Sequence, residues 1–128
     1  MTLREKQSEF ARNVGKLITW CYENGYEISF GEALRTEEQQ LLYFEGYTIV
    51  KAHTDLHFAK APRKTKTMAS NHLLKLAIDL NIFIDGQLIY DKKKLQPIGD
   101  YWGSLHPTNE WGGNWESFYD CPHFEMKP

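Results

Sequence analysis

The sequence has few cysteines, no long hydrophobic run and no large excess of one charge, and each shortage excludes a class of protein. Two cysteines in 128 residues do not suggest a disulfide scaffold. No apolar run approaches the length of a membrane span, and the N-terminus lacks the charged-then-apolar layout of a signal peptide. We therefore expect a protein made in the cytoplasm. A net charge of −2 argues against nucleic-acid binding as its main purpose.

The composition that remains is typical of one ordered domain. Hydrophobic residues make up 41% of the chain and aromatic residues 14%, which excludes a disordered protein. A chain of 128 residues can bury one core but not two. We find no internal repeat, low-complexity tract or linker, so residues 1–128 are predicted to form a single domain.

The first third of the chain carries clear signals for helices and a strand. A capping-box pattern at Thr2–Glu5 precedes apolar residues at helical spacing, and Gly25 is expected just past the end of that helix. Residues 26–33 resemble a strand. A second capping pattern at Thr36–Gln39 predicts a helix that runs to about Gly46.

The middle of the chain contains the strongest strand signal. Within residues 77–84, four aliphatic residues at the even-numbered positions face one way, and Asp79 and Asn81 face the other. This alternation predicts a half-buried strand, and Asp85–Gly86 predicts a tight hairpin turn after it. Residues 47–69 show weak periodicity and much charge, so we expect a long, partly mobile connection. Pro97 is expected in the first turn of a helix that continues to Leu105.

Three residues stand out as a candidate metal site. Asp79 lies on the polar face of the predicted strand, His72 precedes it by seven residues, and His123 lies near the chain's end. Two histidines and one carboxylate are three ligands, which leaves a fourth position open for water on Zn²⁺. The alternative is that both histidines are structural and satisfied by hydrogen bonds.

A metal-assisted attack on an amide needs two further groups. A general base must take a proton and pass it to the leaving amine, and Asp120 is placed for this role in a short turn before His123. A cation must stabilise the developing oxyanion, and Arg35 is the candidate, although its position alone favours an ordinary surface arginine. Glu125 is predicted to face the same side as His123 and to orient it.

Other polar and aromatic residues carry weaker signals. His53 and His57 are four residues apart but are expected to be solvent-exposed, not metal ligands. Cys21 is expected in the core, and Cys121 has a minor alternative as a soft metal ligand. Trp111 opens a Trp-Gly-Gly segment and is either a core aromatic or the wall of a substrate cleft.

One local cluster of basic residues interrupts the balanced charge, namely Lys60, Arg63, Lys64 and Lys66. We interpret it as a solvated loop. The alternative is a patch that attracts an anionic substrate, such as a carboxylate-bearing peptide or a wall polymer.

Three motifs together resemble the M15 family of zinc peptidases: Ser70-x-His72-x6-Asp79, Trp111-Gly-Gly, and Asp120-x2-His123-Phe-Glu125. The similar branch is that of the phage and prophage L-alanyl-D-glutamate endopeptidases (endolysins). The resemblance extends from Phe30 to Met126 and includes Arg35-Thr-Glu-Glu-Gln39. It implies an α+β fold with a small antiparallel sheet flanked by helices, like the hedgehog and D-alanyl-D-alanine-peptidase fold.

The resemblance also implies roles for individual residues. His72, Asp79 and His123 would hold one Zn²⁺ per chain, and Asp120 would be the catalytic base. Arg35 would bind substrate and polarise the scissile carbonyl. Ser70, Gln39 and Trp111 would line the substrate cleft. Lys75 departs from the family pattern, because many members carry glycine there, and its long side chain is expected in or beside the cleft.

The function implied is zinc-dependent cleavage of the L-Ala–D-Glu bond of peptidoglycan by a compact, monomeric catalytic domain without a wall-binding module. Lacking a signal peptide, such a protein would reach the cell wall after membrane damage during phage lysis. The first alternative is a D-alanyl-D-alanine carboxypeptidase or dipeptidase, which needs a cationic anchor such as Lys75 or the basic cluster. The second is a zinc-bearing phage binding protein without catalysis.

Overall fold

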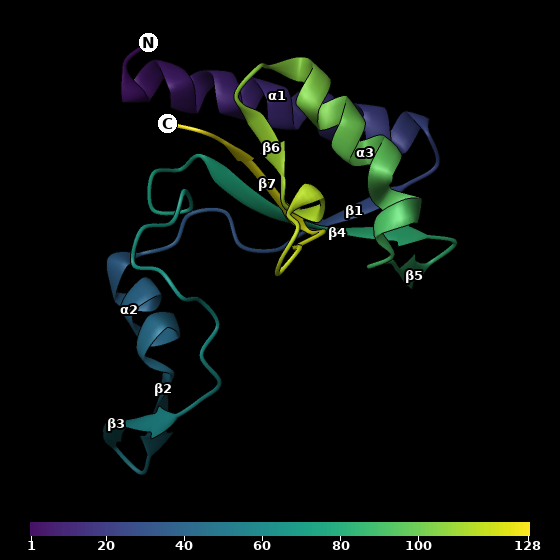
Figure 1. Ribbon diagram of the computed structural model, residues 1–128. Coiled ribbons are helices and arrows are strands. Elements are labelled where there is room, and N and C mark those ends of the chain that lie inside the picture. Colours follow the sequence, from purple (N-terminus) through teal and green to yellow (C-terminus); the bar gives the residue numbers. More distant parts are fainter.

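The computed structural model describes residues 1–128 and contains three α-helices, seven strands and one 3-10 turn (Figure 1). The elements in chain order are α1 (Leu3–Glu23), β1 (Glu27–Phe30), α2 (Glu37–Glu45), β2 (Tyr47–Ala52), β3 (Asp55–Lys60), β4 (Ala77–Ile84), β5 (Gln87–Leu88), α3 (Lys92–Leu105), β6 (Asn109–Trp111), η1 (Gly112–Asn114) and β7 (His123–Met126).

The main sheet is antiparallel, with the strand order β1-β4-β7-β6 and with β5 paired to β4. The predicted strand at 77–84 is confirmed as β4, and the predicted hairpin follows it. Asp85 and Gly86 both have positive φ, as a two-residue turn of the primed type requires. β4 lies inside the sheet, between β1 and β7, so its side chains contribute to the centre of both faces.

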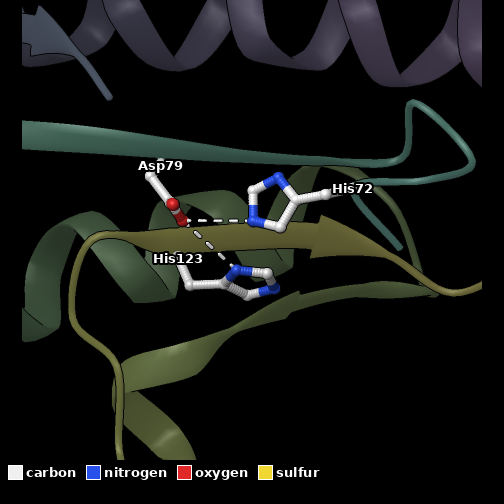
Figure 2. A group of neighbouring side chains, drawn as sticks. All are labelled: His72, Asp79 and His123. Atoms are coloured by element: carbon white, nitrogen blue, oxygen red, sulfur yellow. Dashed lines mark ion pairs between the residues drawn. The ribbon is translucent and has the colours of Figure 1, made fainter. Parts of the chain in front are cut away.

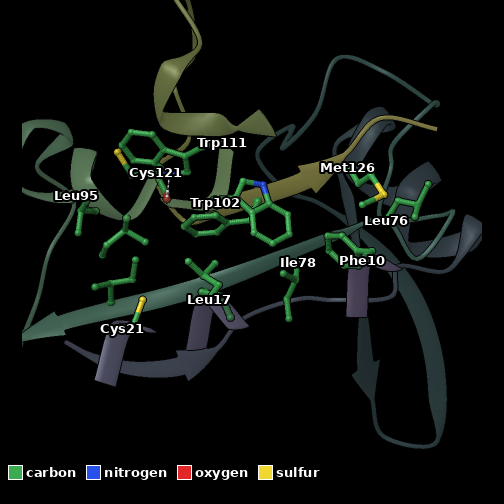
Figure 3. Packing of buried hydrophobic residues seen from close by; sticks show 14 residues of the cluster. Phe10, Leu17, Cys21, Leu76, Ile78, Leu95, Trp102, Trp111, Cys121 and Met126 are labelled. Atoms are coloured by element: carbon green, nitrogen blue, oxygen red, sulfur yellow. Dashed lines mark hydrogen bonds between the residues drawn. The ribbon is translucent and has the colours of Figure 1, made fainter. Parts of the chain in front are cut away.

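Helices α1 and α3 cover one face of this sheet, and the hydrophobic core lies between them and the sheet (Figures 1 and 3). Ile78, Leu80 and Ile82 of β4 point into this core, as the alternation predicts. The intervening Asp79 therefore points to the opposite face. The predicted α+β class, a small antiparallel sheet with helices, is confirmed.

The helix boundaries follow the capping signals. Thr2 and Glu5 form the predicted capping box at the start of α1, and Gly25 lies one position past its C-cap with φ 85°. Thr36 accepts a hydrogen bond from the Gln39 amide at the start of α2, and Gly46 ends that helix in the left-handed conformation. None of the helices is both long and apolar enough to cross a bilayer.

The prediction for residues 47–69 is wrong over its first part. β2 and β3 pair in register from Tyr47↔Lys60 to Ala52↔Asp55 and form a two-stranded ribbon that projects from the body together with α2 (Figure 1). None of the ribbon residues is buried. Because no core imposes an apolar face on it, the ribbon lacks the alternation by which strands are recognised.

The position of Pro97 also differs from the prediction. Helix α3 begins five residues before Pro97, at Lys92, because the Asp91 side chain accepts hydrogen bonds from the Lys93 and Lys94 amides. Pro97 is therefore inside the helix instead of in its first turn. The predicted end at Leu105 is confirmed.

Candidate metal centre

Three side chains meet on the face of the sheet opposite the helices: His72, Asp79 and His123 (Figure 2). Their ligand atoms all lie within 4.8 Å of one another. His72 Nε2 is 3.4 Å and His123 Nδ1 is 3.3 Å from the same Asp79 oxygen, Oδ1. Both histidines are buried, and the carboxylate is partly open to solvent.

Strand pairing places two of the three groups. Asp79 of β4 and His123 of β7 are direct cross-strand partners, so their side chains stand on the same face at neighbouring positions. His72 comes from the turn before β4. The Ser70 hydroxyl accepts a hydrogen bond from the His72 amide at 3.2 Å, and the Arg35 amide donates to the His72 carbonyl.

The residues after β1 hold this arrangement from the other side. The Gly31 amide donates to the Asp79 carbonyl, and the Asp79 amide donates to the Glu32 carbonyl, each at 2.8 Å. An added Cβ at Gly31 would lie 3.0 Å from the Asp79 Cβ. A side chain at this position would thus crowd the candidate ligand. Because residue 31 is glycine, the backbone after β1 can approach Asp79 this closely.

Hydrogen bonds to the outer ring nitrogens fix which inner nitrogens carry lone pairs. His72 Nδ1 donates to the Ala33 carbonyl at 2.8 Å, because a carbonyl can only accept. His123 Nε2 donates to the Glu125 carboxylate at 2.6 Å. In the neutral rings, as a bound metal ion requires, His72 Nε2 and His123 Nδ1 are then the lone-pair nitrogens that face Asp79, which is the orientation of metal-binding histidines. The predicted orienting role of Glu125 agrees with this contact.

The electrostatics of the cluster suit a cation. Asp79 Oδ1 is buried and makes no hydrogen bond. Burial opposes ionisation of Asp79, but its interactions with His123 and His72 outweigh burial and hold its pKa below the usual range. Burial likewise lowers the pKa of His123, but interactions with Asp79 and Glu125 raise it to about 9. Two nitrogens, one unsatisfied oxygen and a convergent geometry therefore fit a zinc-type ion.

The cluster lies in a cleft that also contains Arg35, Ser70, Asp120 and Trp115. The Trp115 ring is 5.0 Å from the His123 ring, and its indole nitrogen donates to Glu110 at 2.8 Å. Trp115 thus forms a wall of the cleft beside a candidate ligand.

Asp120 is held by the Trp-Gly-Gly segment. Its amide donates to the Gly112 carbonyl at 2.8 Å, and the His123 amide donates to the Asp120 carbonyl at 3.0 Å. An added Cβ at Gly112 would lie 2.4 Å from the Asp120 carbonyl oxygen. Burial and the neighbouring Asp79 charge raise the pKa of Asp120. A partly buried carboxyl group with a raised pKa is suited to accept and return a proton.

Arg35 reaches the cleft but is already engaged. Its guanidinium donates to Glu32 at 2.6 and 3.4 Å and to Gln40 Oε1 at 2.9 Å, and it lies over the Tyr43 ring. Gln40 in turn donates to the Thr67 carbonyl at 2.7 Å. Sequence reasoning did not identify Glu32 or Gln40, because the pairing depends on how α2 packs against the loop before it.

Three residues expected in the cleft do not line it. Gln40, not Gln39, is the buried amide beside Arg35. Lys75 is exposed outside the cleft and has φ 58°, a conformation that glycine adopts without strain. Trp111 is a core residue that donates to the Cys121 carbonyl at 2.7 Å (Figure 3), and Trp115 lines the cleft instead. The one sequence feature that could have indicated Trp115 is its position four residues after Trp111 in the same aromatic and glycine-rich segment.

The structure also places the histidines, cysteines and basic residues that carried weaker signals. His53 and His57 are exposed on the ribbon, and Cys21 is buried in the core, as predicted. Cys121 is buried and does not belong to the metal cluster. Within the basic cluster, the structure places three of the four residues at the cleft, namely Arg63, Lys64 and Lys66.

The known proteins to which this chain is similar are peptidases. An M15 peptidase family model, described as D-alanyl-D-alanine carboxypeptidase, matches residues 63–126, half of the chain. The L-alanyl-D-glutamate peptidase of Listeria phage A118 is 29% identical over 115 residues, which are 87% of this chain and 34% of that protein. This chain therefore spans about a third of that relative.

A solved structure shares the fold. The crystal structure of the Serratia marcescens L-Ala D-Glu endopeptidase ChiX superposes with a TM-score of 0.69 and covers 94% of this chain and 79% of that chain. The sequence identity is 18%, so the likeness concerns the fold alone.

Proposed function

The chain belongs to the M15 peptidase family, and from this premise we propose that it is a zinc peptidase that cleaves the L-Ala–D-Glu bond in peptidoglycan stem peptides. The observation that carries the proposal is the convergence of His72, Asp79 and His123 in one cleft with Asp120. Neither a structural histidine pair nor a simple binding site needs a second carboxyl group there.

His72 Nε2, Asp79 Oδ1 and His123 Nδ1 are the proposed zinc ligands. Zinc in such a site supplies a nucleophile at neutral pH and polarises a carbonyl group. Ala33 and Glu125 hold the two rings in the required orientation through their outer nitrogens.

Asp120 is the proposed general base and proton carrier. It lies in the same cleft, and its raised pKa allows it to take a proton during attack and to return it to the leaving amine. Arg35 is the proposed donor to the scissile carbonyl. Glu32 and Gln40 fix its guanidinium plane, so little conformational entropy is lost when substrate binds.

The choice of bond rests on the relatives, one of which is named an L-alanyl-D-glutamate peptidase and the other an L-Ala D-Glu endopeptidase. The family description favours a second candidate, a D-alanyl-D-alanine carboxypeptidase. In either case the substrate lies in the cell wall, and we propose that the protein reaches it after membrane damage.

The experiment that separates these functions is digestion of purified peptidoglycan by zinc-loaded and chelator-treated protein, followed by mass spectrometry of the fragments. We expect new N-terminal D-Glu on the stem peptides, abolished by the chelator. Release of terminal D-Ala would instead establish the carboxypeptidase. Absence of cleavage by folded, zinc-bound protein would reject both and leave a zinc-bearing binding protein.

The Asp120→Asn variant tests the proposed base. We expect activity to fall by about 10²- to 10⁴-fold while bound zinc stays at one per chain, because the base contacts the reacting groups and not the metal. Asp55→Asn on the exposed ribbon is the matched control and should retain full activity. Loss of zinc from the Asp120 variant would show that this residue is a ligand instead.

A further inference from the structure

The cleft carries more positive charge than the proposed chemistry uses. Four cationic side chains line it: Arg35, Arg63, Lys64 and Lys66. The segment 47–69 holds five Lys or Arg residues and one Asp, a net charge of +4, whereas the remaining ten Lys or Arg and sixteen Asp or Glu residues give −6. The segment that supplies three of these four cations is thus basic, whereas the rest of the chain is acidic.

Arg35 differs from the other three cations because its charge is balanced. The Glu32 carboxylate lies 2.6 Å from Arg35 Nε, and the side chain is only 12% exposed. By contrast, no carboxylate lies within 4.0 Å of the charged nitrogens of Arg63, Lys64 or Lys66. These three exposed side chains are the cations in the cleft that have no counter-ion.

Helix α2 holds the segment that carries them. The Lys64 amide donates to the Tyr43 carbonyl at 3.1 Å, and the Ala61 amide donates to the Gly46 carbonyl at 2.9 Å. Arg63 Nε donates to the Phe44 carbonyl at 2.6 Å, and its guanidinium lies over the Phe44 ring. Arg63 is therefore turned back onto the helix. This leaves Lys64 and Lys66 as the cations with unengaged donors.

Aromatic rings position both ammonium groups. Lys64 Nζ lies 5.1 Å from the centre of the Tyr43 ring, and Lys66 Nζ lies 4.0 Å from the centre of the Phe118 ring. Phe118 also lines the cleft, two residues before Asp120 in the chain, and is 75% exposed. An ammonium group that rests on a ring still has N–H groups free for an anion.

We propose that Lys64 and Lys66 form a carboxylate subsite at the rim of the cleft, which binds the free carboxylate of the D-glutamyl residue of the stem peptide. The inference rests on the proposed function. A glutamyl residue that continues a peptide through one carboxyl group keeps the other as a carboxylate. Cleavage at the amine of that residue therefore brings an anion into the cleft beside the scissile bond, where two uncompensated ammonium groups face it.

The subsite makes the enzyme selective for stem peptides in which this carboxylate is not amidated. The test uses three synthetic stem peptides: one with the free glutamyl carboxylate, one with a carboxamide in its place, and one with only the C-terminal carboxylate amidated. For the wild-type protein we expect kcat/KM to fall about tenfold or more on the carboxamide peptide, the usual size of a lost hydrogen bond between charged groups. We expect little change on the third peptide.

Lys66→Met keeps the length of the side chain and removes its charge. We expect it to lower kcat/KM on the carboxylate peptide about tenfold more than on the carboxamide peptide. Lys60→Met is the matched control. Lys60 also lies over an aromatic ring, that of Tyr47, but does not line the cleft, so the peptide preference should stay at the wild-type value.

A binding measurement separates recognition from turnover. Calorimetry with the D-glutamyl product peptide as the probe should show weaker binding to Lys66→Met than to Lys60→Met. Equal cleavage of carboxylate and carboxamide peptides by the wild type would overturn the subsite while leaving the proposed function intact. A preference that follows the C-terminal carboxylate would also overturn it. Release of D-Ala without cleavage before D-Glu would reject the proposed function and the subsite together.

Discussion

The sheet body and the projecting arm of this protein are built on different principles. The body, made of the main sheet with α1 and α3, buries four of the eight β4 residues, including Leu80 and Ile82. The arm, made of α2, β2 and β3, buries no residue of its ribbon and leaves Leu56 and Phe58 more than 70% exposed. The body carries the candidate metal ligands Asp79 and His123, whereas the loops on either side of the arm supply Arg35, Lys64 and Lys66 to the cleft.

This difference suits the two regions to different roles, metal binding for the body and substrate selection for the segments beside the arm. Metal ligands must converge within a few tenths of an ångström, and two of the three candidates lie on paired strands with a core beneath them. Groups that select a substrate tolerate more variation in position. The candidates for that role lie here on segments that contact the body through few buried residues.

The largest expected effect is on stability and compares one leucine from each region. Leu80→Ala should cost about 2–5 kcal/mol of unfolding free energy, because it leaves a cavity among fully buried side chains. Leu56→Ala should change stability by less than about 0.5 kcal/mol, since the side chain is 72% exposed. Urea denaturation of both variants measures this. Similar losses for the two would mean that the ribbon packs against the body in solution.

Gly112→Ala should disturb the backbone contact that positions the proposed base, Asp120. Its added Cβ would lie 2.4 Å from the Asp120 carbonyl oxygen and 3.0 Å from the His123 Cβ, so the backbone must shift, at a cost of about 1–3 kcal/mol. We expect a lower melting temperature and lost activity. Gly103→Ala in α3 is the control, because nothing lies within 4 Å of its added Cβ. Unchanged activity in the Gly112 variant would contradict this positioning role.

Glu125→Gln tests how the body tunes the metal site. The charge that orients His123 through its outer nitrogen is removed, so zinc affinity should fall about 10- to 100-fold in a chelator-competition assay. Glu116→Gln, an exposed change in the loop before Asp120, should leave the affinity at the wild-type value. An unaltered affinity in the Glu125 variant would show that His123 needs no orienting partner.

The smallest expected effect concerns Lys75, which is strained although it is exposed. Its φ of 58° costs a non-glycine residue roughly 1–2 kcal/mol, so Lys75→Gly should stabilise the protein by about 1 kcal/mol after the entropy of glycine is counted. Lys75→Ala keeps the strain and should give no such gain. Thermal denaturation of both variants distinguishes backbone strain from loss of the lysine charge, which the two share.

The sequence predicted the parts of the site that depend on burial and on local hydrogen bonds. The alternation at 77–84 placed Asp79 opposite the core, and the caps at Thr2 and Thr36 located two helices, because these signals involve neighbours in the chain. The motifs around His72 and His123 predicted the candidate ligands, which the structure brings together. The geometry of these three side chains is therefore consistent with the predicted metal site.

Only the tertiary structure decided which other residues reach the cleft. Trp111 and Trp115 lie four residues apart in the same segment, but the first packs in the core and the second beside His123. Gln39 was expected to line the cleft and does not, whereas its neighbour Gln40 is buried against Arg35. Lys75 lies outside the cleft, and Lys64 and Lys66 line it. These choices depend on how segments distant in sequence pack, since an exposed side chain has no periodic pattern to reveal its direction.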